Sequence, residues 1–115
     1  MVKKHSLALN LELKRITQVL KTKYKPEKII LFGSAASGKT KQWSDLDIAV
    51  IKNTKKRFYD RIGEVLKLAN PNEAVDFIVY TPQEFRDMQS YSWFVDQEIV
   101  KKGKIIYEKN AGANL

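Results

Sequence analysis

One stretch of the sequence, residues 32–50, decides the interpretation: it reads FGSAASGKTKQWSDLDIAV. Near its end, Asp45 and Asp47 stand two residues apart at the start of an apolar run (LDIAVI, residues 46–51). Strand side chains alternate between faces, so both carboxylates are expected to point the same way. Two like charges in a half-buried strand repel each other and lose solvation, and a hard divalent cation is the usual compensation. The spacing therefore predicts a metal site.

A third carboxylate lies in a similar apolar setting further along the chain. Asp76 stands between Val75 and Phe77 in residues 74–80, AVDFIVY, which we predict to be a strand because β-branched and aromatic residues dominate it. Aspartates on neighbouring strands would form an all-oxygen site suited to Mg²⁺ or Mn²⁺.

A glycine-serine turn precedes the carboxylates. The strand predicted for residues 28–32, KIILF, runs directly into Gly33 and Ser34. Glycine allows a sharp turn and a close approach to a ligand, and a short helix starting at Ser34 would offer its first N–H groups to phosphate. Each feature alone is compatible with an ordinary turn, a solvated strand start or an ion pair. Their joint order and spacing favours phosphoryl or nucleotidyl transfer assisted by metal.

The rest of the chain reads as alternating helices and strands. Apolar spacings of three and four predict helices over about residues 7–24 and 58–69, and a helical stretch from Pro82 to Lys102 with a break near Ser90. Residues 104–108, KIIYE, are expected to add an edge strand. This order predicts a single small α/β (α+β) domain over residues 1–115, with residues 1–5 and 110–115 as loose tails.

The composition is that of a soluble globular protein: 43% of the 115 residues are hydrophobic and 30% charged. No apolar run approaches the roughly 20 residues of a membrane span. Cysteine is absent, which excludes disulfides and fits a cytoplasmic location. The net charge of +8 favours polyanionic ligands such as nucleotides, nucleic acid or an acidic partner protein, although lysine also simply keeps small domains soluble.

The same stretch also matches the P-loop pattern GxxxxGK[ST], from Gly33 to Thr40. In that fold the loop opens a helix that crosses back to a parallel strand, and the crossover needs at least about ten to twelve residues. Only residues 41–44 separate Thr40 from the acidic strand, so a P-loop remains the weaker alternative.

Gly33-Ser34, ten intervening residues and Asp45-Leu46-Asp47 together resemble a family signature. The pattern is similar to that of the minimal nucleotidyltransferases in the DNA polymerase β superfamily, and Asp76 falls where the third aspartate of that family belongs. The resemblance implies a nucleotidyltransferase fold with a small mixed sheet and helices packed against it. It also implies that Asp45 and Asp47 hold both metal ions, while Asp76 holds one and helps to activate the acceptor hydroxyl.

The resemblance further implies ATP as the nucleotide donor, bound by Gly33 and Ser34. Many family members carry arginines in the next loop, where this chain has Ala35, Ala36 and Ser37. Lys39 and Lys41 are the expected substitutes, although lysine holds phosphate only as a point charge.

The resemblance also suggests a partner, because members of this minimal family act as antitoxins of helical HEPN-domain toxins. The expected reaction is transfer of AMP to a tyrosine of the toxin, and the alternative is neutralisation by complex formation alone. The segment from Met88 to Phe94 is a candidate contact surface, although aromatic residues at this density are more often core.

Overall fold

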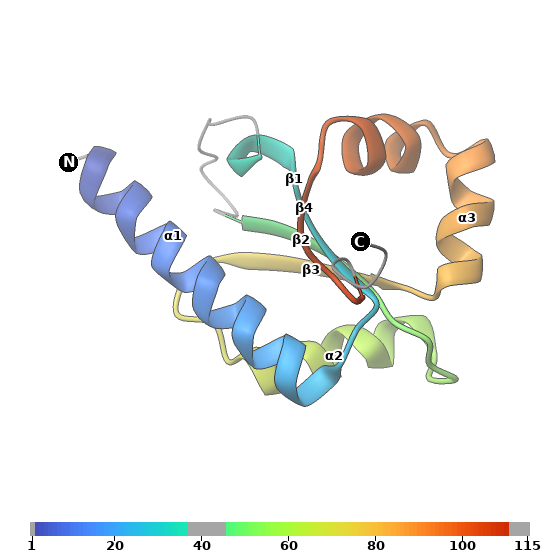
Figure 1. The fold of residues 1–115 in the computed structure, drawn as a ribbon, viewed down its shortest axis with the longest axis horizontal. Helices are drawn as coiled ribbons and strands as arrows, with labels where there is room; N and C mark the ends of the chain where they lie inside the picture. Colours follow the sequence, from blue (N-terminus) through green and yellow to red (C-terminus); the bar gives the residue numbers. More distant parts are fainter. Residues whose placement is uncertain (1, 37–45, 111–115) are drawn as a thin grey trace.

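The structure, a computed structural model, describes residues 2–36 and 46–110, and side chains from residue 7 onward. Helices and strands alternate in the predicted order (Figure 1). Their bounds are α1 Val2–Val19, the π-helical turn Leu20–Tyr24, β1 Lys28–Phe32, the 3₁₀ turn Gly33–Ala35, β2 Leu46–Ile51, α2 Phe58–Ala69, β3 Val75–Tyr80, α3 Pro82–Tyr91, the π-helical segment Phe94–Lys101 and β4 Lys104–Glu108.

The four strands form one mixed sheet in the order β3-β2-β1-β4. β1 pairs antiparallel with both β2 and β4, whereas β2 pairs parallel with β3. This confirms the predicted small mixed sheet, with residues 104–108 as an edge strand. The antiparallel β1–β2 pair also contradicts the P-loop alternative, because a P-loop helix connects strands that run parallel.

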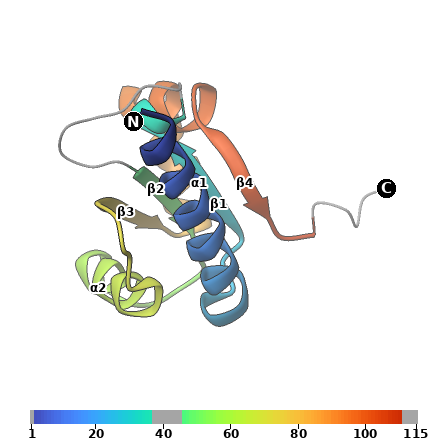
Figure 2. The same cartoon turned by 90° about the vertical axis from the view of Figure 1, so that its left-hand side faces the viewer.

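Helices cover both faces of the sheet (Figures 1 and 2). Helices α1 and α2 pack on one face, while α3 and the segment Phe94–Lys101 pack on the other. Alternate strand residues serve the two cores, as the period of two requires. The α1–α2 side receives Ile29, Leu31, Ile48 and Val50, and the other side receives Ile30, Phe32, Ala49 and Ile51.

Two helix boundaries differ from the sequence-based prediction. α1 begins at Val2 rather than near Leu7, so residues 2–5 are helical and not a loose tail. No glycine or proline precedes Leu7, so nothing in the backbone chemistry stops the helix from extending. The predicted break in the last helical stretch falls at Ser92, which has extended backbone angles. None of the described helices is both long and apolar enough to cross a membrane.

A buried ionic cluster joins α1 to the connection between α2 and β3. The Glu12 carboxylate, 5% exposed, accepts hydrogen bonds from Arg15 at 2.8 and 3.0 Å and from the backbone N–H of Asn72. Arg15 also donates to the carbonyl of Ala69 at 2.9 Å, which caps the end of α2. The Arg15 hydrogen bonds, with help from Asn72, lower the pKa of Glu12 from 4.5 to about 2.

A second cluster joins α2 to α3 across the end of β3. Arg61, only 6% exposed, donates to the Glu84 carboxylate at 2.7 and 3.2 Å. Glu84 also completes a capping box with Thr81, so the same carboxylate starts α3 and anchors it to α2. These hydrogen bonds from Arg61 and Thr81 lower the pKa of Glu84.

Replacing Glu12 with Gln should destabilise the chain at neutral pH, on the order of 2–3 kcal/mol, because it removes a buried charge that Arg15 and Asn72 need. The folded pKa of about 2 lies below the ordinary 4.5, so the stabilisation is full above that value and disappears as the pH falls towards 2. Urea unfolding at pH 7 and at pH 3 measures both effects, with the exposed Asp87→Asn as the control. Equal stability of Glu12→Gln and the wild-type chain at pH 7 would contradict this account.

Candidate active site

The end of β1 and the start of β2 lie side by side because these strands are antiparallel. Phe32 is the register partner of Asp47, so the turn at Gly33 leaves the sheet beside that aspartate. Gly33 has a φ of 72°, in the left-handed region that glycine adopts without strain. Gly33–Ala35 then form the short helical turn that the sequence predicted after β1.

The start of β3 brings a second carboxylate to the same place. β2 and β3 are parallel with Asp47 and Asp76 in direct register, so the two side chains leave the same face of the sheet on neighbouring strands. Asp47 is 5% exposed, whereas Asp76 is exposed at the edge strand. The two aspartates therefore have different access: one lies inside the protein and the other can meet a second molecule.

The chemistry of this pair fits a hard divalent cation. Neighbouring strands lie about 4.8 Å apart, and Mg²⁺ is usually held by one or two carboxylates together with substrate phosphates. Asp45, Lys39 and Lys41, which were also predicted for the site, lie outside the described residues. Across residues 2–36 and 46–110, no three His, Cys, Asp or Glu residues come together as a metal cluster. The structure thus describes two of the three predicted carboxylates and the glycine-serine turn.

An aromatic segment borders this end of the sheet. The ring of Phe94 meets Phe32 edge to face, with 5.7 Å between ring centres, and Phe32 is the strand neighbour of Asp47. Phe94, Trp93 and Tyr91 are 44%, 69% and 74% exposed, so these aromatics are not core residues. Nothing in the local sequence pattern indicated this proximity, since only the fold brings residue 94 to the end of β1.

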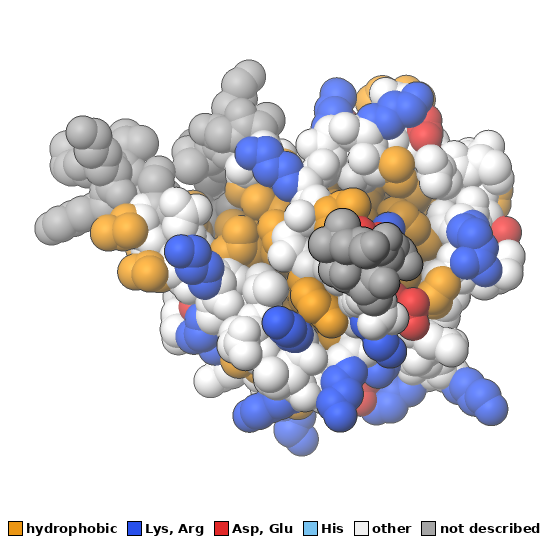
Figure 3. Space-filling view, in the orientation of Figure 1, with side chains coloured by type: hydrophobic (Ala, Val, Ile, Leu, Met, Phe, Trp, Pro, Cys, Tyr) orange, Lys and Arg blue, Asp and Glu red, His pale blue; other side chains and the backbone are white. Residues whose placement is uncertain are grey.

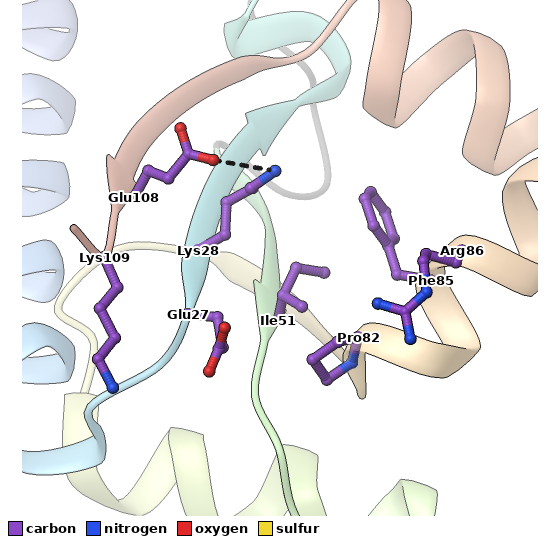
Figure 4. Close-up of a pocket in the computed structure, with 8 residues that line it drawn as sticks. All are labelled: Glu27, Lys28, Ile51, Pro82, Phe85, Arg86, Glu108 and Lys109. Atoms are coloured by element: carbon purple, nitrogen blue, oxygen red, sulfur yellow. Dashed lines mark ion pairs between the residues drawn. The ribbon is translucent and has the colours of Figure 1, made fainter. Parts of the chain in front are cut away.

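The pocket in Figure 4 is a different feature, at the other end of the sheet. It has a volume of about 260 Å³ and lies between the start of β1, the end of β4 and the first turn of α3. Lys28 and Glu108, register neighbours on β1 and β4, form an ion pair at 3.4 Å on one side of it, and Phe85 and Arg86 of α3 border the opposite side (Figure 4). The pocket lies beside Ile51, at the opposite end of β2 from Asp47, so this pocket is not part of the carboxylate site.

Comparison with known proteins identifies the family of the chain and supports its fold. The model of the family described as "Polymerase beta, Nucleotidyltransferase" matches residues 14–112, and the chain belongs to that family. A candidate nucleotidyltransferase from Sulfolobus solfataricus, solved at 1.40 Å resolution, has the same fold: the TM-score is 0.67 at 21% identity, over 94% of this chain and 87% of that one. No curated protein matches the chain significantly.

Measurements of ATP binding can separate the expected role of Lys39 from that of Asp47. We expect ATP to bind more tightly with Mg²⁺ than with EDTA. Asp47→Asn should reduce this ratio of affinities at least about tenfold, since it removes the charge of a metal ligand without changing its shape. Lys39→Ala should weaken binding in both conditions and keep the ratio, because lysine acts as a point charge. Isothermal titration calorimetry measures both, with Asp87→Asn as the exposed-carboxylate control. A complete loss of binding in Lys39→Ala alone would contradict these roles.

Proposed function

We propose that this protein is a divalent-metal-dependent nucleotidyltransferase that transfers AMP from ATP to a hydroxyl group. The observation that carries the proposal is the direct register of Asp47 and Asp76 beside the Gly33 turn. Membership of the polymerase β nucleotidyltransferase family supports the reaction class. The identities of the nucleotide and of the acceptor are proposals.

The two described aspartates suit different tasks. Asp47, buried in the middle of the sheet, is proposed to hold a cation in one position, and Asp45 is expected to assist it. A bound Mg²⁺ or Mn²⁺ would polarise the α-phosphate and neutralise charge on the leaving group. Asp76, exposed at the edge strand, is proposed to hold the same cation through one carboxylate oxygen and to accept the proton of the acceptor hydroxyl on the other. The acceptor oxygen then bonds to the α-phosphorus, the bond to the β-phosphate oxygen breaks, and pyrophosphate leaves.

The phosphate groups are proposed to lie against the Gly33-Ser34 turn. The positive φ of Gly33 turns the backbone away from the strand next to Asp47, so the turn and the carboxylate border the same space. Ala35 and Ala36 follow where related enzymes carry arginines, so this turn supplies no guanidinium of its own. Lys39 and Lys41 are proposed to supply the positive charge instead, as point charges.

The acceptor is proposed to be a tyrosine hydroxyl of a HEPN-domain partner, which would make the protein an antitoxin. Two observations support a macromolecular acceptor: Asp76 is exposed, and the aromatic segment Tyr91–Phe94 is exposed beside the same end of the sheet. Exposed Tyr, Trp and Phe are typical of interface centres. The net charge of +8 would speed association with an acidic partner and make it sensitive to salt.

A second candidate is neutralisation of that partner by binding alone. The absence of arginine from residues 33–37 and the exposed aromatic segment favour it, whereas the retained pair of Asp47 and Asp76 favours catalysis.

Incubation with a HEPN partner, ATP and Mg²⁺ should raise the mass of the partner by one or more AMP units, as measured by intact-protein mass spectrometry. Remote binding energy between the proteins would orient the hydroxyl, so transfer to free tyrosine should be far slower. Asp47→Asn should retain the complex and add no mass, while Asp87→Asn should behave as the wild-type chain. A stable complex without added mass under any metal would replace catalysis with the binding function. The absence of a complex would remove the HEPN partner from the proposal.

A further inference from the structure

A second concave surface lies at the end of the sheet opposite Asp47. It has a volume of about 700 Å³ and is formed by the end of the first helical stretch, the loop after β2 and one side of α2. Five residue steps of β2 separate its Lys52 from Asp47, or about 16 Å. Its lining includes four lysines and two carboxylates, namely Lys23, Lys52, Lys56, Lys67, Asp60 and Glu64. We refer to it as the lysine pocket.

Two of the four lysines are held by other groups. Lys52 donates to the backbone carbonyl of Tyr24 at 2.7 Å and lies 5.0 Å from the centre of its ring. Lys56 pairs with Glu64 at 2.7 Å. Lys23 and Lys67 are exposed and form no ion pair with any other residue between 7 and 36 or 46 and 110. The pocket therefore has positive charge available for a ligand.

The surface around the lysine pocket is also positively charged. Lys and Arg side chains gather along the lower edge of the molecule in Figure 3, where α2 and the end of α1 lie in Figure 1. A concave region inside such a surface concentrates anions.

Tyr24 forms part of the wall of the lysine pocket, beside Glu64. Tyr24 is 5% exposed, and its buried hydroxyl lies close to the Glu64 carboxylate without meeting hydrogen-bond geometry. Burial and, next, the negative charge of Glu64 raise the pKa of Tyr24 to about 12, so the hydroxyl is protonated at neutral pH. Tyr24 therefore forms a fixed, uncharged part of the pocket wall, with its ring beneath Lys52.

We propose that the lysine pocket binds a small molecule that carries both phosphate and free hydroxyl groups. Lys23 and Lys67 would hold the phosphate, and Asp60, an exposed carboxylate, would accept hydrogen bonds from the hydroxyls. The pocket volume lies in the range of small-molecule sites. Nucleoside monophosphates and sugar phosphates share this chemistry. The site is separate from the carboxylate pair, so it stands whether or not the chain transfers AMP.

Titration calorimetry in EDTA, with AMP, ribose 5-phosphate and inorganic phosphate as probes, tests the proposal. Lys67→Gln should weaken binding of AMP or ribose 5-phosphate at least about tenfold, the loss expected for one charge-assisted hydrogen bond. Lys14→Gln is the matched control, another exposed helical lysine with no ion pair among the described residues, and it should change the affinity less than about twofold. Comparable binding of AMP and ribose 5-phosphate would assign a sugar-phosphate site, and binding of AMP alone would assign a nucleotide site.

Three results would overturn the proposal: no binding of any phosphate-bearing probe, equal losses in Lys14→Gln and Lys67→Gln, or binding that Asp47→Asn removes and Lys67→Gln leaves intact.

Discussion

The pairing of β2 with a neighbour on each side is the constraint on which the rest of the structure depends. All six residues of β2 are buried, and Asp47 is the one charged residue among them. Its antiparallel register with β1 brings the Gly33 turn beside Asp47, and its parallel register with β3 brings Asp76 there. A shift of one residue in either pairing would exchange the faces of the sheet and expose the apolar side chains that contact α1 and α2. The core therefore holds the carboxylates together.

The strands and helices could be predicted from the sequence because apolar residues recur with a different spacing in each. Residues 28–32, 46–51 and 104–108 are strands at the predicted bounds, and residues 58–69 are a helix. The pairing of strands was not readable, since a sheet order depends on contacts between distant residues. The juxtaposition of Asp47 and Asp76 was expected from their places on two predicted strands and from the family resemblance, and it is seen in the register, while Asp45, Lys39 and Lys41 stay predictions. The exposure of Tyr91, Trp93 and Phe94 could not be predicted, because aromatic residues at this density are more often core and the sequence pattern alone does not separate a core from a contact surface.

The two ends of the sheet carry different chemical groups. One end of the sheet carries the aspartates, the glycine turn and the exposed aromatics, while the other carries the lysine pocket and the pocket of Figure 4. Partly buried ion pairs hold the helices at fixed positions against this sheet: Glu12 with Arg15 on one side, and Arg61 with Glu84 at the junction of α2 and α3.

Paramagnetic broadening of backbone amide NMR signals by Mn²⁺ shows whether Asp47 and Asp76 share a divalent cation. The account predicts that substoichiometric Mn²⁺ broadens the signals of residues near Gly33, Asp47 and Asp76 first, and that added Mg²⁺ restores them. The same titration of Asp47→Asn should need a much higher Mn²⁺ concentration. Broadening centred on Asp60 and Glu64 instead, with the signals of Asp47 and Asp76 unchanged, would contradict the account.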